Sequence, residues 1–293
     1  MDSLLRLTVR DARVYLRDRT SVFFSLLSVL IIVGMYALFL GDSTVRSIEN
    51  EIGRSVEGVR WMVDAWIMAG ILAVSSMTVT LGAFGVLVDD ESRKRLGAFL
   101  VAPVKRSRLV QGYLLAAMAV GMLLGLVTLL VAELYIVLKG GALLAPAALA
   151  TAALLQVLNV FSSGCIAFFF VSFVRTPGAY GTLSTIVGTL VGFLAGIYLP
   201  VGAMPKGVQS VMKFIPMTHS AALMRQVFMD APMDQVFTGA PVEVRQGIET
   251  VFGIQVNIGG QTVTPAMMIG IVAGAGVLFL LLSILRMNRR KLG

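Results

Sequence analysis

Long apolar stretches separated by short polar segments dominate the chain. Six of them contain the about 20 apolar residues that an α-helix needs to cross a bilayer. They are approximately Ser21–Gly41, Trp66–Val88, Tyr113–Leu138, Ala147–Val174, Tyr180–Leu199 and Ala266–Leu285. This pattern predicts an all-α polytopic membrane protein with six transmembrane helices, forming a single domain over residues 1–293.

Residues 1–20 predict a separate basic helix ahead of the first span. Four arginines repeat at helical spacing on one face and four apolar residues on the adjoining face: Arg6, Arg10, Arg13, Arg17, and Leu5, Val9, Ala12, Leu16. The apolar run that follows has full spanning length and lacks a small-x-small cleavage site, unlike a cleaved signal. We therefore expect an interfacial helix in the headgroup layer.

The charged segment between the second and third spans predicts a compact amphipathic helix. Leu96, Phe99 and Leu100 fall at positions i, i+3 and i+4 and form one apolar stripe. A basic run at residues 93–95 precedes the stripe. Pro103 ends the helix because proline lacks an N–H and disfavours helical geometry in the preceding residue. Such a helix gives a cytosolic partner a defined surface to bind.

Lys and Arg are distributed unevenly between the two sides of the predicted membrane. With the N-terminus inside, 16 of the 24 basic residues fall in cytoplasmic segments and 8 in outer segments. Short loops rich in Lys and Arg stay in the cytoplasm. Both termini are therefore predicted to be cytoplasmic. The formal charge of +8 reflects this topology and does not indicate nucleic-acid binding.

The segment between the fifth and sixth predicted spans is the largest polar region. Four prolines divide its first half: Pro200, Pro205, Pro216 and Pro232. Residues 206–215 and 217–230 predict two short amphipathic helices, with Val211 and Phe228 on their apolar faces. Each piece is too short to cross the bilayer, so we expect both to dip into the outer leaflet. Alternating polar and β-branched residues within 233–264 predict a small outward hairpin.

Three polar residues within the spans leave two interpretations open. Glu133 lies about five residues from the outer end of its span, so it could serve a transport pathway or reach the interface. Gln156 and Asn159 share one stripe of the fourth span with Ser163. That stripe could line a substrate path or form hydrogen bonds between helices.

The remaining composition excludes several kinds of chemistry. A single cysteine, Cys165, rules out an internal disulfide and a Cys-based zinc site. A single histidine, His219, rules out a His-cluster metal site within one chain. The phosphate-binding sequence Gly-x-x-x-x-Gly-Lys-[Ser/Thr] does not occur. We therefore expect no catalytic residues and no metal or other cofactor on this chain, and an ATP-driven process would need a separate ATPase.

The order of these elements resembles the permease subunits of bacterial ABC-2 type exporters over nearly the whole chain. The sharpest match lies in residues 90–112, where family members carry an acidic residue, a basic residue, a Leu-Leu-x-x-Pro-like stretch and a second basic residue. The matching residues are Glu91, Arg93, Leu100, Pro103 and Arg106. A second match is Leu199-Pro-Val-Gly-Ala-Met-Pro205 followed by Phe214-Ile-Pro216 and Arg225, similar to the family's re-entrant outer helices. The insertion at 230–264 departs from minimal members.

The resemblance implies roles for two regions. The cytoplasmic loop 89–108 would couple to an ABC ATPase through Glu91, Arg93, Lys94, Leu96, Phe99, Leu100, Pro103 and Arg106. The outer region 200–264 would hold a gate that includes Pro200, Pro205, Val211, Pro216, Arg225 and Phe228. It further implies a bacterial plasma-membrane protein, a second permease subunit in a homo- or heterodimer, and ATP with Mg on the partner ATPase. The apolar spans favour an amphiphilic substrate such as a drug, peptide, lipid or glycan.

Two other classes of function were weighed. An ion-coupled secondary transporter favours inverted repeats and paired broken helices near the midplane, and neither pattern is evident in the sequence. A membrane-embedded enzyme needs converging catalytic groups within the spans, for which Glu133 alone is insufficient. The sequence therefore favours an export permease.

Overall fold

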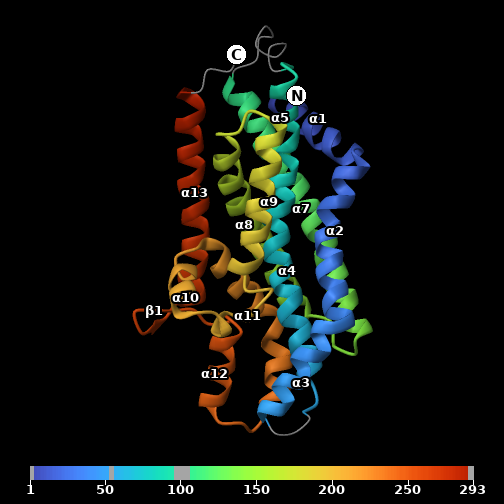
Figure 1. The fold of residues 1–293 in the computed structure, drawn as a ribbon, viewed down its shortest axis with the longest axis vertical. Helices are drawn as coiled ribbons and strands as arrows, with labels where there is room; N and C mark the ends of the chain where they lie inside the picture. The colour runs from blue at the N-terminus through green and yellow to red at the C-terminus, as the bar shows by residue number, and fades with distance from the viewer. Residues whose placement is uncertain (1–2, 53–55, 96–105, 290–293) are drawn as a thin grey trace.

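The structure, a computed structural model, describes residues 3–52, 56–95 and 106–289. Apart from one short hairpin, the described chain is helical and forms an elongated bundle (Figure 1). Its helices are α1 Ser3–Arg17, α2 Arg19–Met35, η1 Tyr36–Leu40, α3 Gly41–Ile52, α4 Val59–Ala83, α5 Gly85–Ser92, α7 Arg106–Leu138, α8 Pro146–Val171, α9 Pro177–Leu194, η2 Val201–Ala203, α10 Lys206–Met212, α11 Pro216–Val236, α12 Val242–Val251 and α13 Pro265–Arg289. The hairpin consists of β1 Asn257–Ile258 and β2 Gln261–Thr262.

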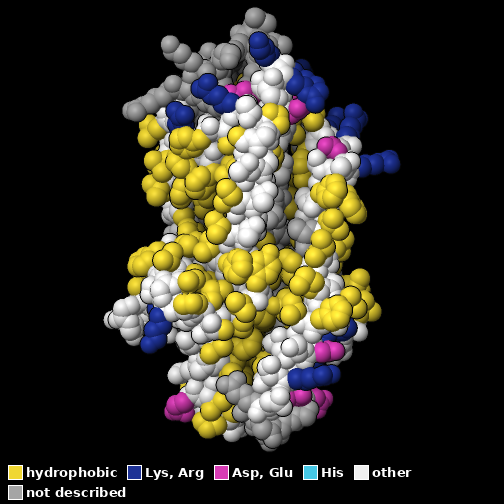
Figure 2. Space-filling view, viewed as in Figure 1, with side chains coloured by type: hydrophobic (Ala, Val, Ile, Leu, Met, Phe, Trp, Pro, Cys, Tyr) yellow, Lys and Arg dark blue, Asp and Glu magenta, His cyan; other side chains and the backbone are white. Residues whose placement is uncertain are grey.

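Membrane-spanning helices make up most of the bundle, which confirms the predicted all-α polytopic class. Within the described residues, five stretches are long and apolar enough to cross: Arg19–Asn50, Val59–Ser92, Ser107–Leu138, Pro146–Val171 and Pro265–Arg286. The remaining predicted span, the fifth along the chain, corresponds to α9, whose 18 residues extend about 27 Å against a hydrocarbon thickness of about 30 Å. The count of six spans therefore stays a prediction. Figure 2 shows hydrophobic side chains over much of the length of the bundle, with many of the basic residues near its upper end.

The first span is longer than the sequence indicates. Its helix does not end at Gly41 but continues through the π-helical turn η1 into α3 and reaches Ile52. Tyr36, the first residue of η1, donates a hydrogen bond from its hydroxyl to the carbonyl oxygen of Ile197 at 2.6 Å. Because a π-turn adds a residue without breaking the helix, Tyr36 reaches this buried carbonyl while α2 and α3 stay continuous.

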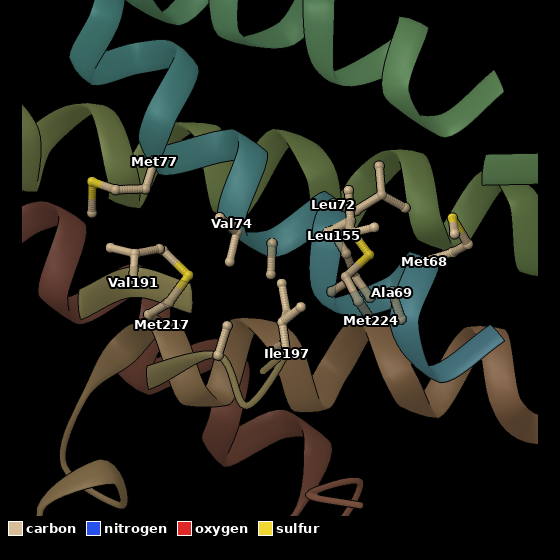
Figure 3. Packing of buried hydrophobic residues seen from close by; sticks show 14 of the residues in the cluster. Met68, Ala69, Leu72, Val74, Met77, Leu155, Val191, Ile197, Met217 and Met224 are labelled. Carbon is tan, nitrogen blue, oxygen red and sulfur yellow. The ribbon is translucent and has the colours of Figure 1, made fainter. Parts of the chain in front are cut away.

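Helix α4 is the centre of the packing. Nearly all of its residues are buried, as expected for a helix that is apolar on every side, and it packs chiefly on α7, α8 and α11. The buried apolar residues form one continuous cluster; Figure 3 shows part of it, with Met68 and Met77 from α4 near Met224 and Met217 from α11. The described core is therefore a single body around α4.

A short break at Phe84 separates α4 from α5. The hydroxyl of Tyr180, on α9, donates to the carbonyl oxygens of Leu81 at 2.7 Å and Gly82 at 3.1 Å. These bonds give partners to carbonyl groups at the end of α4, where the helix runs out of N–H donors. The break is therefore held in place by a neighbouring helix.

Helix α9 ends at Leu194, five residues before the predicted end at Leu199. Gly196 adopts a φ of +64°, a left-handed conformation that stops a helix and favours glycine. The ring of Tyr198 then folds back onto Phe193 with 5.0 Å between ring centroids. The apolar residues 195–199 therefore form this turn and not a further part of the helix. The prediction that they continue the span was wrong.

The outer region contains more helix than the sequence suggests. Helix α11 continues past Asp230 and Pro232 to Val236, so the predicted end at Asp230 was wrong. Pro232 and Val236 are buried, and this packing offsets the hydrogen bond that a proline removes from a helix. The predicted hairpin is confirmed as β1 and β2, joined at Gly259-Gly260. The ten-residue helix α12 within 233–264 was not predicted.

Candidate functional site

The predicted coupling segment is described only at its two ends. Leu96, Phe99, Leu100 and Pro103 lie outside the described residues, and of Arg106 only the helical backbone at the start of α7 is described. The entry to the segment is α5, which ends at Ser92. The amphipathic helix predicted for this segment therefore stays a prediction, and the structure describes only the elements on either side of it.

A tight turn follows α5 and exposes three basic residues. Arg93 donates to the Asp89 carboxylate at 2.8 Å, and Lys94 has a left-handed φ of +56°. The backbone N–H of Arg95 returns to the carbonyl oxygen of Asp90 at 2.9 Å. Positive charge at the C-terminal end of a helix is favourable because the helix dipole is negative there. The turn thus presents a basic surface at the end of α5, next to Glu91.

Asp90 forms a buried ionic cluster directly before this turn. It is 1% exposed, and it accepts hydrogen bonds from Arg10 at 2.5 Å and from the Tyr113 hydroxyl at 2.7 Å. Arg95 also lies 3.3 Å from the Asp90 carboxylate. A buried carboxylate requires such partners because desolvating an unpaired charge is very costly. The cluster joins α1, α5 and α7 at the entry to the coupling segment.

Asp11 adds a second buried carboxyl to this cluster. Arg10 contacts it at 2.7 Å, yet burial raises the pKa of Asp11 to about 6 because the loss of hydration outweighs the pairing with Arg10. The two carboxylates in turn raise the pKa of Arg10, chiefly through the hydrogen bond to Asp90. The arginine therefore stays charged, while Asp11 changes its protonation within about a unit of neutral pH.

Helix α1 is confirmed, but its packing face differs from the expected one. Leu7, Asp11 and Tyr15 are the buried residues, whereas Leu5 and Leu16 are exposed. The prediction grouped Arg10 with Arg6, Arg13 and Arg17 on one helical face, and the structure turns Arg10 toward Asp90. Arg10 turns inward because the buried carboxylates of Asp11 and Asp90 attract its positive charge. The prediction used only the spacing of arginines and apolar residues and did not consider these carboxylates.

The six predicted gate residues occupy the starts and faces of short outer helices. Pro200 and Pro205 directly precede η2 and α10, and Pro216 is the first residue of α11; at these positions a missing N–H costs little. Val211 is 60% exposed, whereas Phe228 is 1% exposed and packs in the core. Within this chain the two apolar residues therefore do not share one buried face, although both belong to elements between α9 and α13.

Arg225 is the most unusual of these residues because it is fully buried without a carboxylate among its described partners. It donates to the carbonyl oxygens of Ala195 at 2.7 Å and Gly196 at 3.0 Å, where α9 ends. Its guanidinium also lies 5.3 Å from the ring of Trp66. Terminal carbonyls and an aromatic face both favour a cation. Arg225 thus joins the end of α9 to α4 and α11.

Two of the three polar residues singled out inside the spans make structural contacts. Glu133 accepts a hydrogen bond from the backbone N–H of Leu144 at 3.0 Å and so holds the loop between α7 and α8. Gln156 donates to the Ser76 hydroxyl at 3.1 Å. Asn159 is 1% exposed, and neither side-chain polar atom has a partner within the described residues. Glu133 and Gln156 therefore make contacts that hold the structure together, which is one of the two interpretations that the sequence left open.

Sequence reasoning missed the acidic partners that hold these helices together. Asp11, Asp90 and Tyr113 were not selected, and neither was an outer cluster in which Arg60 pairs with Asp42 and with Asp64 at 2.9 Å. The sequence signal that could have found these pairs is an acidic residue close to the end of a span, because such a residue requires a basic partner. In the described parts of the chain, no group of three His, Cys, Asp or Glu residues could hold a metal ion.

The geometry shows the class of protein: it is a multi-pass α-helical membrane protein with a buried ionic cluster at one end of its bundle. The sequence model described as "ABC-2 family transporter protein" matches residues 57–285. This match covers well over half of the chain, so the chain belongs to the ABC-2 transporter family and is a transmembrane transport subunit. A comparison with curated proteins found no match. Family membership implies association with an ABC ATPase and with a bilayer.

Proposed function

We propose that this chain is the permease subunit of an ATP-driven exporter in a bacterial plasma membrane, with its ATPase on a separate chain. The observation that carries the proposal is the buried Asp90 cluster, which joins α1, α5 and α7 where the coupling segment begins. Force applied to that segment would reach all three helices together. ATP and Mg would bind to the partner ATPase, and a second permease subunit would complete the path.

The outer helices act as the exit gate in this proposal. They lie between the end of α9 and the start of α13, and Arg225 ties them to the α9 terminus. Nucleotide-driven closure of the ATPases would move the coupling segments and tilt the spans as rigid bodies. The substrate would be amphiphilic, because the spans are apolar and carry few charges.

Disrupting the coupling segment is expected to separate ATP hydrolysis from transport. The double variant Phe99→Asp with Leu100→Asp removes the apolar stripe, and Glu91→Ala removes the acidic residue beside it. Both should insert in the membrane but lose co-purification of the ATPase or its stimulation by substrate. Pull-down and ATPase assays in nanodiscs measure this, with the exposed lipid-side variant Leu154→Ala as control. Normal transport and normal ATPase binding in the variants would refute the assignment.

Cysteine labelling tests the proposed orientation. In a Cys165→Ala background, cysteines at Ser92 and Asn288 are expected to react with a membrane-impermeant maleimide only from the cytosolic side. A cysteine at Gly239, in the turn between α11 and α12, should react only from outside. The expectation follows from the 16-to-8 distribution of basic residues. Outside labelling of the Ser92→Cys variant would invert the topology.

A further inference from the structure

An apolar cavity lies within the bundle, apart from the ionic cluster and the coupling segment. Its volume is about 340 Å³, and α4, α8, α9, α11 and α13 all contribute to its wall. Figure 3 shows three of its lining residues, Met77, Val191 and Met217, side by side at one end of the core. The cavity thus lies where α9 ends and the outer region begins.

The wall of the cavity selects an uncharged, apolar occupant. Aliphatic, aromatic and methionine side chains dominate it, and the polar side chains among the described lining residues are the hydroxyls of Ser162, Ser163 and Ser220. So apolar a wall disfavours ordered water, which needs two to four polar partners. Its two methionines can adapt to occupants of irregular shape because their side chains are flexible.

The position of the cavity identifies the source of the occupant. It lies between α9 and α13. Helix α9 packs mainly on α4 and α5, whereas α13 packs mainly on α8 and α11. Two of its lining residues, Phe170 and Leu190, are also 42% and 52% exposed, so the cavity reaches the outer surface of the spanning helices. In a bilayer, the medium in contact with that surface consists of acyl chains.

The volume is consistent with part of a lipid. A dry apolar cavity of about 150 Å³ holds one benzene molecule, so a cavity of about 340 Å³ accommodates a longer segment but not a whole phospholipid. We propose that this cavity binds one acyl chain of a bilayer phospholipid, whose headgroup remains outside the wall. The chain would occupy the junction of α9 and α11. This inference does not depend on the direction of transport or on the substrate.

Photolabelling in nanodiscs tests the proposal. The probe is a phosphatidylcholine with a diazirine in the middle of one acyl chain, and labelled residues are mapped by mass spectrometry. We expect labels concentrated at Met77, Val191 and Met217. Filling the cavity with Ala167→Phe or with Val187→Phe should abolish these labels. The second substitution lies at a partly exposed position, which keeps the test valid if the first variant fails to fold.

Matched controls distinguish the cavity from general contact with lipid. Leu154→Phe adds a similar ring at a site on α8 that is 71% exposed, and it should leave the labels unchanged. Labels spread evenly over the exposed faces, or labels at the cavity that persist in a correctly folded filling variant, would overturn the proposal. A photoactivatable sterol labelling these residues when the phospholipid does not would also overturn it, in favour of a sterol-shaped ligand.

Discussion

Replacing Asp90 with alanine is expected to weaken the end of the bundle where α1, α5 and α7 meet more than most single changes in this chain. The substitution leaves Arg10 and Tyr113 without their shared acceptor. Removing one partner of a buried ion pair lowers the free energy of unfolding by about 3–5 kcal/mol. Because Arg10 is partly exposed and keeps some contact with water, we expect a loss near the lower end of this range. Reversible SDS unfolding in mixed micelles measures the loss, and protease access to α1 should rise with it.

The adjacent residue provides a matched control. Asp89 carries the same charge one position earlier, but its side chain is 41% exposed and pairs with the exposed Arg93. Ion pairs of this kind contribute at most about 1 kcal/mol, so Asp89→Ala should have little effect on stability. Equal losses in the two variants would show that the charge of the segment, rather than the buried cluster, stabilises this end.

Introducing a charge at Phe228 is expected to unfold the outer region. Phe228 is 1% exposed on α11, which packs against the central helix α4. Truncating a buried phenylalanine alone costs about 3–5 kcal/mol, and burying an unpaired carboxylate adds to that cost. Phe228→Asp should therefore give no correctly folded outer region, measured as loss of the protease-resistant fragment that contains α11.

An exposed position on the same helix separates this effect from the added charge. Ala231 lies three residues further along α11 and is exposed, so Ala231→Asp should stay within about 0.5 kcal/mol of the parent protein. If Phe228→Asp retained both a folded outer region and transport, the packing of α11 against α4 would not be required for the proposed gate.

Sequence patterns predicted the helical spans well because apolar length is a strong signal. The third span was predicted to end at Leu138, and α7 ends there. Errors arose where local geometry decided the outcome. The left-handed Gly196 stops α9 inside an apolar run, and the buried Pro232 continues a helix that proline usually ends. Both depend on packing partners far away in the sequence.

The candidate site was less predictable than the fold. Pattern reasoning located the charged segment after the second span because charge between two spans is conspicuous. It did not find the pairing of Arg10 with Asp90, since these residues are 80 positions apart and no spacing rule within one segment relates them. It placed Arg225 in a re-entrant outer hairpin but did not find the α9 carbonyls and Trp66, which allow the guanidinium to be buried.

The break at Phe84 has a mechanical consequence. Together α4 and α5 run from Val59 to Ser92, a path of about 51 Å at helical rise. One end carries the contacts with α11 and the other carries Asp90. The pair therefore acts as a two-part lever whose joint is Phe84, clamped by Tyr180. If that clamp is released, a pull on the α5 arm bends the joint and is absorbed there. While it holds, the same pull swings the outer arm.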